Sequence, residues 1–272
     1  MRLKNRLTIT LPNDLLKAID TTIDGSTIRN RSHAIEVLVT NSLQNPLEYA
    51  VILTGGDRYH PNPALKLFAS QKLINLTLGR ISAAGLKTVV ICLGKDGDMI
   101  KRAVGDGEQW GLSIKYVTEA EPSGSGGALK KAETYIPAEH FLVLHGDIVS
   151  NVDLKRFFKF HEQENTLATI VVKPKKSGKS FGKALIEGNQ ITDFFEKTDS
   201  KGIDIVNTGI YCCKQALFNL LPAKGCNLER DIFPILAKER QLTAFLFQGY
   251  WYDVSTGKDY EEASKVWVRM KQ

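Results

Sequence analysis

Three apolar runs, at residues 50–54, 88–93 and 141–145, constrain the fold of this chain most strongly. Stretches with the period of a helix lie between them. Continuous apolar strands of this kind are buried on both faces, as in parallel sheets that are covered by helices. Residues 49–272 are therefore predicted to form an α/β domain, with an open, mixed, mostly parallel Rossmann-like sheet and helices on both faces. The ligand of such a sheet binds outside the carboxyl ends of the strands.

The N-terminal residues follow a different pattern. Residues 6–11 alternate between polar and apolar side chains, which is the period of a half-buried strand. Asn13 and Asn30 are predicted to cap the two short helices that follow. One strand and two helices cannot make a stable monomer, because the strand lacks a partner and its apolar face lacks a cover. Residues 1–45 are therefore predicted to make the chain a homodimer or a dimer of dimers.

The segments NRLTITLPNDLLKAID and NRSHAIEVLV resemble the ribbon-helix-helix family of transcriptional repressors. This resemblance implies a small ribbon-helix-helix module and a double-stranded DNA partner. Bases would be read from the outer face of the ribbon, at Arg6, Thr8 and Thr10. A backbone phosphate would lie at the start of the second helix, at Arg31 and Ser32. The alternative is a dimerisation module that does not bind DNA. The net charge of +6 is too diffuse to decide between the two.

A glycine turn, TGGDRYHPNPALKLF, follows the first apolar run. Gly55 and Gly56 would let backbone N–H groups approach a phosphate closely, and Arg58 and Lys66 could neutralise its charge. A glycine pair after a strand is weak evidence for a nucleotide when it is taken alone.

Two carboxylates are candidate metal ligands. Asp147 follows the apolar run at residues 141–145, and Asp253 follows two aromatic residues in GYWYDVSTGKDY. Read separately, the first could be a helix cap and the second a turn acid. Read together, they could hold Mg²⁺, which prefers a few carboxylates with water and phosphate oxygens.

Residues 49 to about 262 resemble the sugar-1-phosphate nucleotidyltransferase family, through the ordered motifs AVILTGG, EAEPSGSGGAL, FLVLHGD, FFEKTD, NTGIY, LERDIFPILA and GYWYDVSTGKDY. The resemblance implies that Asp147 and Asp253 bind the metal. It implies a nucleotide site at Gly55, Gly56 and Gly124, and a sugar-phosphate site at Gly182, Glu196, Lys197 and Asn207. The alternatives are a solvated strand end for Glu196 and Lys197 and a turn for Asn207.

The activity that this resemblance implies is nucleotidyl transfer from a nucleoside triphosphate to a sugar 1-phosphate. Arg58, Lys66 and Asp147 would then be the catalytic residues. The loop departs from the family, because Arg58 comes two places after Gly56 rather than four and a Gly-Thr pair is missing. An enzyme fused to a DNA-binding module is the favoured function. The alternative is a transcriptional regulator whose degenerate enzyme domain senses a nucleotide sugar or a sugar phosphate. The resemblance favours guanylyl transfer to a manno-configured sugar.

The remaining features give simpler expectations. The four cysteines lack C-x-x-C spacing and are predicted to be reduced. A basic run is predicted to be a solvated hairpin, with its charges at Lys173, Lys175, Lys176, Lys179 and Lys183. No stretch has the length and apolar character of a signal peptide or a membrane span, so a cytoplasmic protein without membrane contact is predicted.

Overall fold

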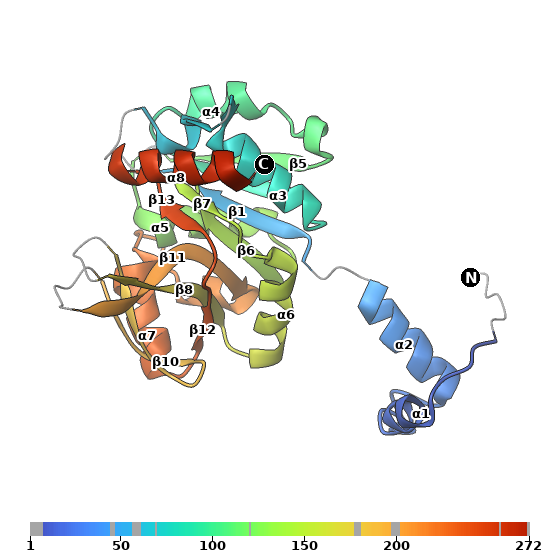
Figure 1. Cartoon of the computed structure of the whole chain (residues 1–272). Helices are drawn as coiled ribbons and strands as arrows, with labels where there is room; N and C mark the ends of the chain where they lie inside the picture. Colours follow the sequence, from blue (N-terminus) through green and yellow to red (C-terminus); the bar gives the residue numbers. More distant parts are fainter. Residues whose placement is uncertain are drawn as a thin grey trace. The chain divides into compact units, whose positions relative to one another are not determined.

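The structure of the protein is a computed structural model. It describes residues 8–43, 47–55, 61–68, 70–119, 121–176, 181–196, 202–255 and 257–270. The chain divides into two compact units, Met1–Pro46 and Leu47–Gln272 (Figure 1). In the described part of the chain, no helix combines the length and the hydropathy that crossing a membrane requires.

The first unit contains two helices, α1 (Asn13–Asp20) and α2 (Arg31–Leu43). The predicted cap of the second helix is confirmed, because the Asn30 side chain accepts a hydrogen bond of 2.9 Å from the His33 amide. The predicted cap of the first is wrong by one residue: Asn13 is already helical, and Pro12 occupies the cap position. Residues 8–12 form no strand in this single chain, and the predicted ribbon would need a second chain to pair with.

The first half of the large sheet in the second unit is parallel. Its strands, in spatial order, are β5 (Ser113–Thr118), β4 (Thr88–Leu93), β1 (Tyr49–Leu53) and β6 (His140–His145). Val51 of β1 lies opposite Val90 of β4 and Val143 of β6. The three apolar runs are therefore parallel strands, as predicted, and they are neighbours in the sheet.

The second half of the sheet is mainly antiparallel. The order continues from β6 through β11 (Ile203–Lys214), β8 (Ala168–Lys176), β12 (Leu242–Leu246), β10 (Gln190–Phe195) and β9 (Lys183–Glu187). Only the pair of β8 and β12 is parallel here. The prediction of a mostly parallel sheet is thus wrong for this half. The predicted basic hairpin is also wrong, because the neighbours of β8 are β11 and β12 rather than β9.

Helices cover both faces of the sheet, as predicted (Figure 1). One core cluster joins alternate strand residues such as Val51 to α5 (Gly124–Ala132) and α7 (Phe233–Lys238). The opposite cluster joins residues such as Ile52 to the helices α3 (Leu73–Ala83), α4 (Gly97–Val104) and α6 (Leu154–Glu164). Cys212 and Cys213 fall in opposite clusters, and all four cysteines are buried and free.

Short elements complete the unit at the ends of the strands. A two-stranded sheet pairs β7 (Ile148–Ser150) with β13 (Trp251–Asp253), and α8 (Gly257–Met270) follows it. A second small sheet pairs β2 (Leu67–Phe68) with β3 (Gln71–Lys72). Phe68, Val149, Val254 and Ala263 join these pieces in a third apolar cluster. This cluster fixes the segment that carries Asp253 against the segment that carries Asp147.

Candidate active site

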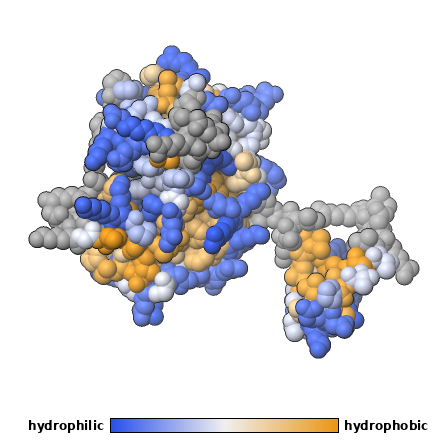
Figure 2. Space-filling view, viewed as in Figure 1, coloured by the Kyte–Doolittle hydropathy of each residue, from blue (hydrophilic) through white to orange (hydrophobic). Residues whose placement is uncertain are grey.

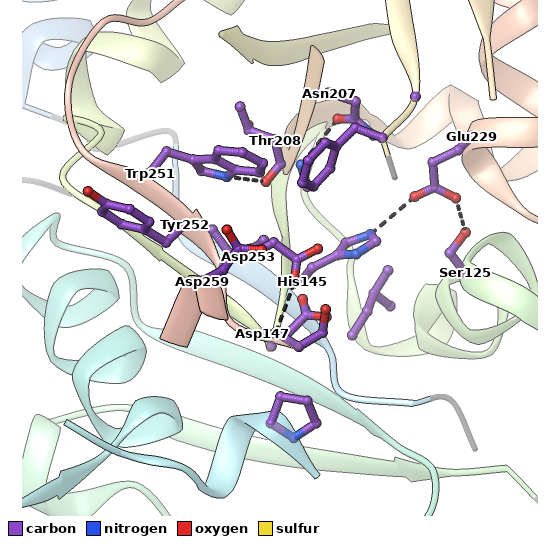
Figure 3. Close-up of a pocket in the computed structure, with 18 of the residues that line it drawn as sticks. Ser125, His145, Asp147, Asn207, Thr208, Glu229, Trp251, Tyr252, Asp253 and Asp259 are labelled. Carbon is purple, nitrogen blue, oxygen red and sulfur yellow. Dashed lines mark hydrogen bonds and ion pairs between the residues drawn. The ribbon is translucent and has the colours of Figure 1, made fainter. Parts of the chain in front are cut away.

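A cavity of 1740 Å³ opens at the carboxyl ends of β1 and β6 and extends over β8 and β11. Thr54 lies just after β1 in its wall, and His145 ends β6. A cavity therefore lies where the sequence predicts the ligand site, outside the carboxyl ends of the strands. Figure 3 shows residues from both halves of the sheet converging on this space.

The structure brings the two predicted metal carboxylates together. Asp147 follows β6 and Asp253 ends β13, and both line the cavity (Figure 3). The pairing of β13 with β7 sets Asp253 opposite Ile148. The Val254 amide also donates a hydrogen bond of 2.9 Å to the Asp147 carbonyl. Two acids that are 106 positions apart in the sequence (253 minus 147) thus become neighbours through one short ladder.

The surroundings of Asp147 suit a bound cation. Its Oδ1 is buried and has no hydrogen-bond partner among the described residues. Burial, and then the charge of Asp253, raise the pKa of the Asp147 carboxyl to about 6. The Asp253 Oδ1 accepts a hydrogen bond of 2.9 Å from the Ser255 amide. The described residues contain no cluster of three or more metal-binding side chains. The pair therefore fits Mg²⁺, which takes its other oxygens from water and phosphate.

Asn62, which was not predicted as a site residue, anchors the chain after the glycine turn to the end of β1. Asn62 Nδ2 donates 2.7 Å to the Thr54 carbonyl, and the Asn62 amide donates 3.0 Å to the Asp96 carboxylate. These bonds close the loop at its base, with Gly55 in the cavity wall. Gly56 and Arg58 lie outside the described residues, so their predicted contacts with phosphate stay predictions.

Lys66 has a contact that the sequence did not suggest. Its Nζ donates 2.6 Å to the Val254 carbonyl, directly after Asp253, and lies 5.3 Å from the centre of the Tyr260 ring. Burial lowers the pKa of Lys66, while the charges of Asp253 and Asp147 act in the opposite direction. Lys66 therefore stabilises the turn that carries Asp253 and places a cation near both carboxylates.

Gly124 begins α5 at the cavity wall, with a φ of 78°. A Cβ at this position would lie 2.4 Å from the Cys226 carbonyl oxygen, so only glycine fits. The amide of Gly126 donates 2.9 Å to the same carbonyl. The glycine motif thus draws the start of α5 against the segment that carries Glu229.

A buried polar network in the cavity wall joins β6, α5 and β11, and of its residues only Asn207 was predicted from the sequence. Glu229 Oε1 lies 3.1 Å from His145 Nε2 and accepts a hydrogen bond of 3.0 Å from the Tyr211 hydroxyl. Its Oε2 accepts one of 2.6 Å from Ser125, and Asn207 Nδ2 donates 2.9 Å to the Tyr211 hydroxyl. Glu229 lies in a single π-helical turn, Leu228–Ile232, a form that is frequent at functional sites.

The His145–Glu229 pair is charged at neutral pH. Burial alone would lower the pKa of His145, but the hydrogen bond and charge of Glu229 raise it to about 9. Burial alone would raise the pKa of Glu229, but its bonds with His145 and Ser125 lower it to about 2. The sequence did contain a signal for both residues, because His145 immediately precedes Gly146-Asp147 and Glu229 lies in the motif LERDIFPILA.

The predicted sugar-phosphate residues meet on the β11 side of the cavity. Gly182, Glu196 and Asn207 line this side, whereas Lys197 lies outside the described residues. A bulge in β11 presents Asn207, because the register with β8 shifts between Asn207 and Tyr211. Gly209, with a φ of 75°, makes the bulge possible. The Trp251 indole donates 2.8 Å to the Thr208 carbonyl that the bulge exposes (Figure 3).

The prediction that the basic run is solvated is wrong for most of its described members. Lys173 and Lys175 line the cavity, in contact with aromatic rings. Lys183 is buried and lies 3.0 Å from the Asp204 carboxylate. Lys176 is exposed at the rim, and Lys179 lies outside the described residues. Lys173 and Lys175 are two residues apart in β8, so both side chains lie on one face of the strand, and Lys176 lies on the other.

The predicted DNA-contacting residues of the first unit remain untested. Thr8, Thr10 and Ser32 are exposed, and Arg6 lies outside the described residues. Arg31 forms a two-pronged ion pair with Asp20, at 2.6 and 2.7 Å. Its guanidinium is therefore engaged within the unit, and a phosphate would compete with Asp20 for it.

Comparisons with known proteins agree with this geometry. The profile of a family described as nucleotidyl transferase matches residues 50–268. A mannose-1-phosphate guanylyltransferase of Mycobacterium tuberculosis is 28% identical over 232 residues, covering 81% of this chain and 64% of that protein. Mannose-1-phosphate guanyltransferase beta-B of Xenopus laevis is 30% identical over 226 residues, covering 78% of this chain and 62% of that protein. The chain thus spans less than two thirds of the length of either relative.

A solved structure shares the fold of the second unit. The crystal structure of HddC from Yersinia pseudotuberculosis aligns with a TM-score of 0.71 and 21% identity. The alignment covers 81% of this chain and 99% of that chain.

Proposed function

Because the chain belongs to the nucleotidyl transferase family, we propose that its second unit is an enzyme that joins a nucleoside triphosphate to a sugar 1-phosphate. The products are a nucleoside diphosphate sugar and pyrophosphate. One observation carries the proposal: Asp147, with an unpartnered buried oxygen, and Asp253 line the same cavity at the ends of β6 and β13. The names of the relatives support guanosine triphosphate and mannose 1-phosphate as the first substrates to test.

The two substrates would occupy opposite sides of the cavity. The nucleotide would lie against Gly55 and Gly124, which line the cavity. Gly56, the third predicted nucleotide residue, lies outside the described residues. The sugar phosphate would lie on the β11 side, against Gly182, Glu196 and Asn207. Lys197, which the family motif also assigns to it, lies outside the described residues. A phosphate oxygen of the sugar 1-phosphate attacks the α-phosphorus, and the bond from that phosphorus to the β-phosphate bridging oxygen breaks. Pyrophosphate leaves with the electron pair of that bond.

The protein's part in this reaction is positioning and charge neutralisation. The sugar phosphate is already ionised at neutral pH, so no side chain has to remove a proton. Asp147 and Asp253 would hold Mg²⁺, which when bound neutralises phosphate charge and orients the substrates. Arg58 would contact the triphosphate. Lys66 would hold the turn of Asp253 and add a positive charge beside it.

A substrate screen tests this proposal. Nucleoside triphosphates are combined with sugar 1-phosphates in the presence of Mg²⁺, and the release of pyrophosphate is followed. We expect one pair to give the highest kcat/KM, with guanosine triphosphate and mannose 1-phosphate as the leading pair. Binding of a nucleotide sugar without any pyrophosphate release would instead support the regulator, whose enzyme-like domain senses its ligand.

For the first unit we propose a ribbon-helix-helix dimer that binds double-stranded DNA. Exposed apolar side chains support the second copy: Ile9, Leu15, Leu38 and Val39 each have between 42% and 48% of their surface exposed. Figure 2 shows hydrophobic residues gathered on the surface of this unit. The proposal predicts that the full chain enriches one palindromic sequence from a pool of random duplexes. Enrichment of none would leave the unit a dimerisation module.

The proposal places the protein in the cytoplasm. Its support is that all four cysteines are free and buried, as is usual in a reducing compartment.

A further inference from the structure

Two lysines of β8, Lys173 and Lys175, form part of the cavity wall, and we call them the β8 lysine pair. They are two residues apart on one strand, so their side chains leave the same face of the sheet. Both line the cavity on the side where the sugar phosphate is proposed to bind. The sequence motifs of the family assign neither of them a role.

Aromatic rings hold the Lys175 ammonium in place. Its Nζ lies 4.3 Å from the centre of the Phe181 ring and 5.0 Å from that of Trp251. These two rings meet edge to face, with centres 5.2 Å apart. Trp251 is itself fixed by its hydrogen bond of 2.8 Å to the Thr208 carbonyl. Ring electrons stabilise a cation on their face and leave its charge available to an anion.

Lys173 is fixed in a similar way. Its Nζ donates 2.6 Å to the Gly249 carbonyl and lies 5.6 Å from the centre of the Phe247 ring. Burial, and then the charge of Lys175, lower the pKa of Lys173. No ion pair in the described part of the chain joins either lysine to a carboxylate. The wall therefore holds two positive charges that repel each other and that form no ion pair with a carboxylate of the described residues.

We propose that the β8 lysine pair binds a second anionic group on the sugar phosphate. The acceptor would then be an acidic sugar 1-phosphate that carries a carboxylate or a further phosphate besides the one at C1. This inference rests on the proposed function, because it concerns the acceptor of that reaction. Lys197 is already assigned to the sugar phosphate by the family motif, so the β8 lysine pair is additional positive charge.

The position of the pair favours the sugar over the triphosphate. Phe181, which contacts Lys175, is adjacent to Gly182 of the sugar-phosphate site. Gly55 and Gly124 of the nucleotide site belong instead to the ends of β1 and the start of α5, in the parallel half of the sheet. An anion on the far end of the sugar would therefore be nearer to β8 than the β- and γ-phosphates would.

The test measures binding to the full chain by calorimetry with three acceptors that differ at C6. Mannose 1-phosphate, which is uncharged at C6, is the reference; mannuronic acid 1-phosphate adds a carboxylate there, and mannose 1,6-bisphosphate adds a phosphate. We expect at least one acidic ligand to bind about tenfold or more tightly than the reference, as a charge-assisted hydrogen bond provides. The acidic ligand with the higher affinity shows whether the pair binds a carboxylate or a phosphate. Lys175→Gln should remove most of this preference, and Lys175→Arg should retain it.

Lys115→Gln is the matched control, because Lys115 is an exposed strand lysine in β5 and does not line the cavity. It makes the same change in net charge and should keep the preference. A thermal melt shows whether each variant is folded, and the wild-type comparison stands without any variant. Equal binding of all three ligands, or a preference that survives Lys175→Gln, would overturn the inference. A Lys175→Gln variant that loses affinity only for the nucleoside triphosphate would also overturn the inference. Absence of pyrophosphate release with every acceptor would refute the proposed function, while the calorimetry would still decide on the pair.

Discussion

Asp147 is a buried acid in a cluster of charged groups, which includes His145 and Lys66 as well as Asp253. Its Oδ1 has no partner among the described residues, and the nearby Asp253 adds a like charge. A bound cation would offset this negative charge, because a buried charge without a partner is destabilising.

Replacing either carboxylate tests this reading of the residue. Asp147→Asn and Asp253→Asn should each lower pyrophosphate release by about a hundredfold or more, since metal coordination supplies several kcal/mol of charge stabilisation. Mg²⁺ should raise the melting temperature of the wild type and have little effect on either variant. Without metal, Asp147→Asn should melt at a higher temperature than the wild type, because it removes the buried charge. Near wild-type turnover in either variant would exclude a two-carboxylate site.

His161 should make stability depend on pH. Its side chain is fully buried, its Nδ1 lies 2.8 Å from the Thr169 hydroxyl, and the His140 ring is 5.2 Å away. Burial, followed by the charges of His140 and Lys214, lowers the pKa of His161 from 6.5 to about 3. Below pH 6.5, His161 therefore binds a proton in the unfolded chain but not in the folded chain. The stabilisation that neutral His161 gives to the folded chain is therefore fully present above pH 6.5 and is lost as the pH falls toward about 3.

Urea unfolding at a series of pH values measures this contribution. The free energy of unfolding of the wild type should fall by up to about 1.4 kcal/mol per pH unit through His161. His161→Gln, which keeps a polar group for Thr169, should reduce the slope by about that amount. An unchanged slope would mean that other groups, such as His140, carry the pH dependence.

Some site residues could be predicted from the sequence and others could not. Asp147 was predictable because a buried strand leads directly to it, and strand ends of a parallel sheet meet at one edge. The partnership of Tyr211 with Glu229 depends on how a bulged strand meets a π-helical turn, and neither feature leaves a periodic signal. Side-chain contacts of this kind follow from tertiary packing.

At the scale of elements, the parallel half of the sheet was predictable and the antiparallel half was not. Strands buried on both faces have continuous apolar runs, as β1, β4 and β6 do. An apolar run does not encode the direction of its strand, so the antiparallel entry of β11 beside β6 had no signal. For the same reason, the alternation of lysines in β8 was compatible with a solvated face until the neighbours of the strand were known.

The bulge in β11 gives a prediction with an internal control. Gly209 has a φ of 75°, and a Cβ there would lie 3.1 Å from the His145 ring. Gly188 has a φ of 63° with open space around it. Alanine at either position should cost about 1 kcal/mol of stability through the backbone. Only Gly209→Ala should also lower kcat/KM, because it displaces His145 beside Asp147. Equal kinetics for the two variants would mean that the bulge does not position the site.

At the scale of the whole molecule, the apolar surface of the first unit predicts self-association. Val39→Glu should convert a dimer to a monomer, as measured by sedimentation or light scattering, and should abolish selective DNA binding. Thr8→Ala should weaken selective binding and leave the dimer intact, because Thr8 is on the polar side of the alternating segment. Both variants should retain pyrophosphate release, since residues 50–268 match the family profile without the first unit. A monomeric wild type would refute the predicted ribbon.

The change of strand direction between β6 and β11 has a consequence for the history of such a protein. Donor recognition is proposed to depend on loops of the parallel strands, and acceptor recognition on the strands beyond β11. Substitutions on β8 or β9 can therefore exchange one acceptor for another while the donor stays the same. The two proposed metal ligands follow β6 and end β13, so they lie on neither β8 nor β9 and need not change. Under the proposed division, related proteins with this sheet would change their sugar specificity through single strands and keep the same nucleotide specificity.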